Sequence, residues 1–134
     1  MKDELKQKVY FADTDTYGVV WHGTYLRWME IGRVEFCDKI GIDLVKLKSM
    51  DIAIPVTNIN IKYKASAKLN ENIIVETSLS KITPLSATFT QLIKNADTGI
   101  VYTKAEVDIV AVTNDGKLYR RLPNELKTIL EGAL

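Results

Sequence analysis

The sequence predicts an α+β fold in which a curved antiparallel sheet of about five strands wraps around one long helix. Apolar residues recur every three or four positions between Thr24 and Ile40, a spacing typical of a helix that is covered on most sides. After Pro55 the apolar period changes to two, and four alternating segments follow, separated by turn residues. Antiparallel strands joined by turns share one apolar face, and we expect the long helix alone to cover it.

The long helix carries two informative glycines. Gly32 lies in its middle, where glycine costs about 1 kcal/mol relative to alanine. We therefore expect a neighbouring backbone to approach closely at that position. Gly41 is a typical C-cap residue and predicts the end of the helix. A short second helix is expected over residues 43–50, with Leu44 and Leu47 buried.

The remaining elements follow from alternation and from turn residues. The segment after Pro55 is predicted to be a half-buried strand, with Ile59, Ile61 and Tyr63 on its apolar side. Proline at position 123 predicts the start of a C-terminal helix, because proline is favoured at the first position of a helix. The other predicted strands are Lys6–Phe11, Ile73–Ile82, Ser86–Lys94 and Ile100–Thr113. The last helix is predicted over Pro123–Leu130.

Size and composition restrict the class of protein. A chain of 134 residues is most simply a single domain spanning residues 1–134. The net charge is +1 and no basic stripe is present, which argues against a nucleic-acid partner. The single cysteine, Cys37, excludes an intrachain disulfide, and no apolar run approaches the roughly 20 residues of a membrane span. With a charged first segment unlike a secretory signal, these features predict a cytoplasmic protein.

The segment from Phe11 to Tyr25 concentrates the residues that can do chemistry. It holds Asp13, Asp15, a glycine turn and the only histidine, and the long helix follows at once. A carboxylate on a loop before a helix can act as a base or nucleophile. The helix start supplies free N–H groups for a developing negative charge.

The residues of this segment have competing interpretations. Asp15 is a general base, a nucleophile or a turn carboxylate that caps the loop. We expect Asp13 to order the loop through an Asx turn. For His22 we expect a backbone N–H that binds an oxyanion and an imidazole that positions Asp15 or water. One histidine and one cysteine do not make an ordinary zinc site, so no metal is expected.

The apolar part of the same segment is the expected substrate-binding region. Gly18 permits a positive φ angle or a close approach to substrate. Val19, Trp21 and Tyr25 either line an acyl pocket or belong to the core.

The element order and the run from Val9 to Tyr25 resemble the hotdog-fold acyl-CoA thioesterases. The branch is the one with 4-hydroxybenzoyl-CoA thioesterase and the Tol–Pal-associated thioesterases. Serine stands at position 66, where that family commonly has proline. The resemblance implies hydrolysis of acyl-CoA to a free acid and coenzyme A, with Asp15 catalytic, the amide near His22 on the carbonyl and Ser86 near the ligand path. It also implies no cofactor, and a homodimer or homotetramer with active sites between subunits.

The sequence leaves two alternatives to acyl-CoA hydrolysis open. One is hydrolysis of acyl-acyl-carrier-protein. The other is a hotdog domain that binds acyl-CoA without turnover.

Overall fold

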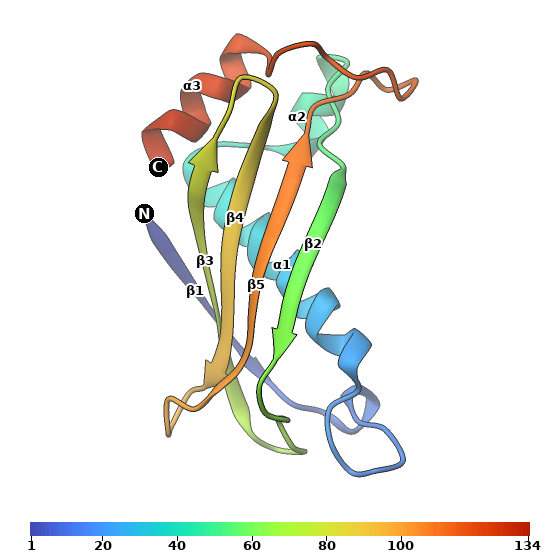
Figure 1. The fold of residues 1–134 in the computed structure, drawn as a ribbon, viewed down its shortest axis with the longest axis vertical. Coiled ribbons are helices and arrows are strands. Elements are labelled where there is room, and N and C mark those ends of the chain that lie inside the picture. The colour runs from blue at the N-terminus through green and yellow to red at the C-terminus, as the bar shows by residue number, and fades with distance from the viewer.

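The computed structural model describes residues 1–134 as one five-stranded sheet with helices on one side (Figure 1). The strands lie in the order β1-β3-β4-β5-β2, and every neighbouring pair is antiparallel. The elements are β1 (Lys2–Lys8), the 3₁₀ turn Phe11–Asp13, α1 (His22–Ile40), α2 (Leu44–Ser49), β2 (Val56–Tyr63), β3 (Asn72–Ile82), β4 (Ser86–Asn95), β5 (Val101–Val110) and α3 (Asn124–Ala133).

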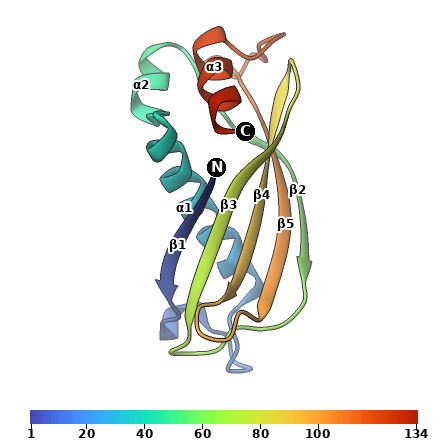
Figure 2. The same cartoon turned by 90° about the vertical axis from the view of Figure 1, so that its left-hand side faces the viewer.

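The core lies between the sheet and α1, as the apolar pattern predicts. Figure 2 shows α1 running along one face of the curved sheet, while the opposite face has no helix. The inward residues of β3 and β4, and those of β5 from Thr103 onward, are buried in the alternation expected from the sequence. At the start of β5 the alternation fails, because Tyr102 is buried next to Thr103. The helix α3 also contributes Leu126, Leu130 and Ala133 to the buried set. The expectation that the long helix alone covers the sheet is therefore wrong.

The helix α1 begins at His22, two residues before the predicted start, and ends at Ile40. Gly41 has a φ of 93°, the left-handed conformation expected of the C-cap. Gly32 does face a close neighbour, but the neighbour consists of side chains of β3 and not of backbone. A Cβ atom at this position would lie 2.8 Å from Val75 Cγ1 and 2.9 Å from Thr77 Oγ1.

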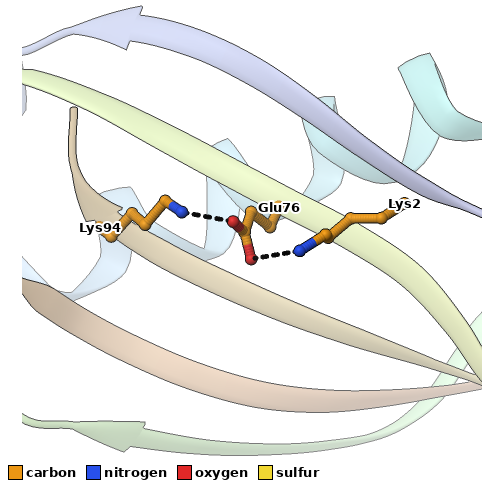
Figure 3. A network of polar contacts seen from close by, with 3 residues as sticks. All are labelled: Lys2, Glu76 and Lys94. Carbon is orange, nitrogen blue, oxygen red and sulfur yellow. Dashed lines mark hydrogen bonds and ion pairs between the residues drawn. The ribbon is translucent and has the colours of Figure 1, made fainter. Parts of the chain in front are cut away.

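The first strand differs from the prediction. It spans Lys2–Lys8 and pairs along its length with β3, from Lys2 opposite Ser78 to Lys8 opposite Asn72. The predicted strand Lys6–Phe11 extended too far, because the chain turns into the 3₁₀ segment at Phe11. The charged residues before Lys6 obscured the strand, and ion pairs accommodate two of them: Lys2 pairs with Glu76 of β3, and Asp3 pairs with Lys39 of α1. Glu76 of β3 contacts Lys94 Nζ at 2.5 Å and Lys2 Nζ at 3.9 Å (Figure 3).

The edge strand β2 is more exposed than predicted. Val56, Ile59 and Tyr63 are 40%, 39% and 46% exposed, so within one chain the strand is not half-buried. The reason is its position: β2 pairs with β5 alone, and its other backbone edge has no partner strand.

Both short helices also differ in detail from the prediction. In α2, Leu47 is buried, but Leu44 is 41% exposed because it lies at the start of the helix beside a surface hollow. In α3, Pro123 occupies the N-cap and not the first helical position, and the helix continues to Ala133. No helix of the structure combines the length and apolar character needed to cross a membrane.

Candidate active site

The residues between Asp13 and His22 form a small closed hairpin at the start of α1. The N–H of Trp21 donates to the carbonyl of Asp13 at 2.9 Å, and Thr14 and Val20 form an antiparallel bridge. Closer to the tip, the N–H of Asp15 donates to the carbonyl of Val19 at 2.9 Å. The hairpin therefore brings the chain back on itself and holds Asp15 one residue beyond the Thr14–Val20 bridge, beside the strand that leads into the helix.

Gly18 closes the tip of this hairpin. Its N–H donates to the carbonyl of Asp15 at 3.1 Å, and its φ of 78° lies in the left-handed region. The expected positive φ is confirmed. No other atom would lie within 4 Å of an added Cβ, so the glycine is required by its backbone angle and not by crowding.

The carboxylate of Asp15 is half-buried and only partly used by the loop. Its Oδ1 accepts the N–H of Tyr17 at 2.8 Å, which makes an Asx turn. No group of the chain donates to its Oδ2. The residue thus caps its own turn and still offers a second oxygen to a water molecule or a substrate.

Asp13 has a different part in the loop. Its carboxylate is buried, and Oδ2 accepts the N–H of Tyr10 at 2.8 Å, which closes the 3₁₀ turn Phe11–Asp13. Its carbonyl accepts the hydroxyl of Thr24 at 3.1 Å. Asp13 orders the loop as expected, but the Asx turn assigned to it belongs to Asp15.

The start of α1 presents free donors beside this hairpin. The backbone N–H groups of His22 and Gly23 donate to no group of the chain, and the N-cap residue Trp21 makes no side-chain cap. The positive end of the helix dipole lies at the same place. These two N–H groups can therefore stabilise an oxygen that becomes negatively charged.

Aromatic side chains surround the helix start. The ring of His22, an exposed residue, lies 5.1 Å from that of Trp21 and 6.5 Å from that of Tyr63, between centroids. The hydroxyl of Tyr63 donates to the carbonyl of His22 at 3.0 Å. Gly23 makes room for the indole, because a Cβ there would lie 2.2 Å from a ring carbon of Trp21. Sequence reasoning missed Gly23 and Tyr63, and a glycine two positions after an aromatic residue was the available signal.

The predicted substrate-binding residues divide into three groups. Gly18, Val19 and Trp21 lie in the Asp15 hairpin or at its end, and Trp21 is 52% exposed. Tyr25 is buried in the core, where its hydroxyl accepts the N–H of Ala67 at 2.9 Å and burial raises its pKa. Ser86 begins β4, at the end of the sheet away from the hairpin, and its hydroxyl lies 2.8 Å from that of Thr83 (Figure 1). One chain therefore does not bring Ser86 to Asp15.

A hollow with a volume of about 250 Å³ lies beside α1 on the side of the β2 edge. Burial lowers the pKa of Arg33 in its wall, and its guanidinium donates to Gln91 Oε1 at 2.9 Å. The sequence analysis did not single out Arg33. The other residues of the wall are mostly apolar: Glu30, Val34, Cys37, Leu44, Ile54, Pro55, Val56, Phe89 and Ile109.

Known proteins resemble this chain in both sequence and structure. The acyl-CoA thioester hydrolase YbgC of Escherichia coli is 30% identical over 119 residues, which cover 89% of this chain and 88% of that protein. The acyl-CoA thioesterase YbgC of Haemophilus influenzae is 30% identical over 122 residues, 90% of this chain and 88% of that protein.

The crystal structure of Slr0204, a 1,4-dihydroxy-2-naphthoyl-CoA thioesterase from Synechocystis, shares the fold with a TM-score of 0.87. The two chains are 20% identical, and the match covers 97% of this chain and 96% of that one. A family model described as the thioesterase-like superfamily matches residues 9–130, which include the Asp15 hairpin and every strand from β2 to β5. The chain belongs to the thioesterase-like superfamily, and its fold is the hotdog fold.

Proposed function

We propose that this protein hydrolyses acyl-CoA thioesters to a free carboxylic acid and coenzyme A, with Asp15 as the catalytic carboxylate. One observation carries the assignment: the hairpin holds Asp15, with an oxygen that accepts no hydrogen bond, next to a helix start with two unused N–H groups. The reaction class rests on membership of the superfamily and on the names of the YbgC relatives.

In the proposed reaction, the thioester carbonyl oxygen accepts hydrogen bonds from the N–H groups of His22 and Gly23. Asp15 takes a proton from water, and the resulting hydroxide adds to the carbonyl carbon. When the tetrahedral intermediate collapses, the C–S bond breaks and the thiolate of coenzyme A leaves with the proton. If Asp15 is instead the nucleophile, its oxygen adds to the carbonyl carbon, the C–S bond breaks and the thiolate of coenzyme A leaves, which gives a mixed anhydride. Water then hydrolyses this anhydride to the free acid and the Asp15 carboxylate, and the thiolate takes up the released proton.

The decisive experiment is steady-state hydrolysis of acyl-CoAs from acetyl to palmitoyl, with benzoyl and 4-hydroxybenzoyl, followed by thiol release. Asp15→Asn is expected to lower kcat by about 100-fold or more, the usual contribution of a general base, while acyl-CoA binding measured by calorimetry is retained. Asp115→Asn, a carboxylate change in an exposed turn, is the matched control and should keep wild-type turnover. Unchanged turnover in Asp15→Asn would remove that residue from the mechanism.

Two further arms separate the alternatives. Faster turnover of acyl-acyl-carrier-protein than of acyl-CoA would identify the carrier-protein thioester as the substrate. Binding of acyl-CoA without turnover would identify a domain that binds acyl-CoA and does not hydrolyse it. A single turnover in H₂¹⁸O distinguishes the two routes for Asp15. Label in the Asp15 carboxylate, which requires water to attack the aspartyl carbonyl of an anhydride, identifies the nucleophile. A general base puts the label in the acid product alone and forms no anhydride that hydroxylamine can trap.

We also propose that the active form is a homodimer in which the β2 edges of two copies pair. Edge strands of monomers are ordinarily short, charged or covered, whereas β2 has eight residues with Val56, Ile59 and Tyr63 exposed. Pairing of one edge with its own copy about a two-fold axis is antiparallel. Because Tyr63 ends β2 and contacts His22, such pairing would place the second copy next to the Asp15 hairpin.

The dimer is tested by Ile59→Lys, which puts a charge on the exposed edge. The expected result is a monomer by light scattering, with hydrolysis reduced in parallel. Ile100→Lys changes a more exposed isoleucine in the β4–β5 turn and should leave mass and activity unchanged. A wild-type protein that is monomeric and active would contradict the proposal.

A further inference from the structure

The Asp15 hairpin rests on the segment between β2 and β3. The carbonyl of Ala67 accepts the N–H of Val20 at 2.9 Å, and Val19 forms an antiparallel bridge with Lys68. On its other side, the N–H of Ala67 donates to the hydroxyl of Tyr25 on α1 at 2.9 Å. The segment thus lies against the hairpin through one isolated bridge and one further backbone hydrogen bond, and it contacts α1 on its other side.

One side chain, Glu71, holds this segment. Its Oε1 accepts the N–H of Lys68 at 2.5 Å. Its Oε2 accepts the side-chain amide of Asn95 and the hydroxyl of Tyr102, each at 3.0 Å. A single carboxylate therefore joins the segment behind Asp15 to Asn95 of β4 and Tyr102 of β5 through two hydrogen bonds, and a third closes the turn at Lys68. These bonds are stronger than neutral ones because the acceptor is charged.

A β-bulge supplies the Tyr102 contact. Ile93 lies opposite Thr103 and Lys94 lies opposite Val101, so Tyr102 has no residue opposite it in β4. Tyr102 and Thr103 are consequently both buried although they are adjacent. Burial raises the pKa of Tyr102, and its hydrogen bond to Glu71 raises it as well.

The bulge also anchors the beginning of the segment. The carbonyl of Tyr102 accepts the N–H of Lys64 at 2.7 Å and that of Ala65 at 3.3 Å, where β2 ends. Bulges redirect side chains and are frequent beside active sites. Tyr102 therefore fixes the segment at its start through its backbone and at its end through Glu71.

We infer that Glu71, held by Asn95 and the bulged Tyr102, is a positioning residue for the Asp15 site. It fixes the segment 67–71, and that segment sets the geometry between the Asp15 carboxylate and the free N–H groups of α1. The inference rests on the proposed function of Asp15. Glu71 does not touch the reacting atoms, so its removal should act on kcat and only weakly on substrate binding.

Glu71→Ala is the first variant to measure. It leaves the buried Tyr102 hydroxyl without its acceptor and releases the N–H of Lys68, while the Asn95 amide keeps only its bond to the Tyr102 oxygen. We expect kcat to fall by about 10- to 100-fold, the order of effect of an ångström-scale misplacement, with KM within about threefold. Amide exchange at Val20 should become faster. Glu71→Gln keeps one acceptor oxygen and should recover part of kcat.

The matched control is Glu76→Ala. Glu76 is also a half-buried carboxylate that joins strands, through Lys2 and Lys94 (Figure 3). Its ion pairs involve no residue of the Asp15 hairpin. It should lower the melting temperature and leave both kcat and Val20 exchange at wild-type values. If Glu71→Ala does not fold, Tyr102→Phe removes one of the three contacts and is expected to shift kcat in the same direction.

The outcomes separate this inference from the proposed function. Wild-type kcat and Val20 exchange in Glu71→Ala, or equal loss of kcat in Glu76→Ala, would overturn the positioning role. A wild-type protein without turnover on any thioester would overturn the proposed function instead. Exchange at Val20 would then still show whether Glu71 holds the hairpin.

Discussion

The hydroxyl of Tyr63 donates a hydrogen bond to the carbonyl of His22 at 3.0 Å, and so joins the last residue of the edge strand β2 to the first residue of α1. The contact ties the proposed dimer edge to the helix start that carries the free N–H groups. A change at the strand edge can therefore reach the proposed site directly.

Tyr63→Phe tests this link, because it removes the hydroxyl and keeps the ring. Since the bond is partly exposed, the free energy of unfolding should fall by only about 1 kcal/mol. We expect kcat on the best acyl-CoA to fall several-fold. Tyr17→Phe is the control, since Tyr17 is 88% exposed and its hydroxyl makes no hydrogen bond. Equal kcat values for Tyr63→Phe and wild type would show that the contact does not influence the site.

Gly32→Ala is expected to destabilise the protein even though alanine favours helices. Helix propensity favours alanine by about 1 kcal/mol. The added methyl would lie 2.8 Å from Val75 and 2.9 Å from Thr77, and such overpacking costs about 1–3 kcal/mol. Gly132→Ala, in α3 with open space around the position, should stabilise slightly. Urea unfolding measures the stability of both variants. If Gly32→Ala were more stable than wild type, β3 would have to move away from the added methyl.

Thr103→Val is expected to raise the melting temperature. The hydroxyl of Thr103 is fully buried and has no hydrogen-bond partner, so an isosteric methyl removes a desolvation penalty of about 1–3 kcal/mol. Thr77→Val is the counterpart, because the Thr77 hydroxyl accepts the side-chain amide of Gln91 at 2.9 Å. That change should lower the melting temperature. Destabilisation by both changes would indicate that the Thr103 hydroxyl has a partner in solution.

Cys37 predicts a loss of stability at alkaline pH. Burial raises the pKa of this thiol from 9.0 to about 11, and Asp38 adds to the effect. Between these values the unfolded chain loses a proton that the folded chain keeps, so stability is complete below about pH 9 and declines as pH rises toward 11. The full loss is on the order of 2–3 kcal/mol.

The measurement is urea unfolding of wild type and Cys37→Ala at several pH values from 7 to 10.5. The difference between the two isolates the thiol from the tyrosines and lysines that titrate in the same range. The expected result is a flatter decline in Cys37→Ala. Parallel curves would show that the thiol is not buried in solution.

The periodic elements could be predicted from sequence because their signal is local. Alternation identified β3, β4 and β5 with their buried faces, and the three-to-four spacing identified α1 to within two residues of its start. The turn that holds Asp15 was predictable for the same reason, since its residues lie within ten positions of each other, but its closure into a hairpin was not predicted. Both Gly18 and Gly41 have the positive φ angles expected of them.

The tertiary structure decided what depends on partners distant in the chain. The polar strand β1 is defined by its pairing with β3, and the exposure of β2 by its place at the edge. The contact from Tyr63 to His22 spans 41 positions, and that from Tyr102 to Glu71 spans 31. The sequence by itself thus determined the periodic elements and the turn that carries Asp15. Only the packed sheet decided which side chains hold that hairpin, because a hydrogen bond between distant residues leaves no periodic trace in the chain.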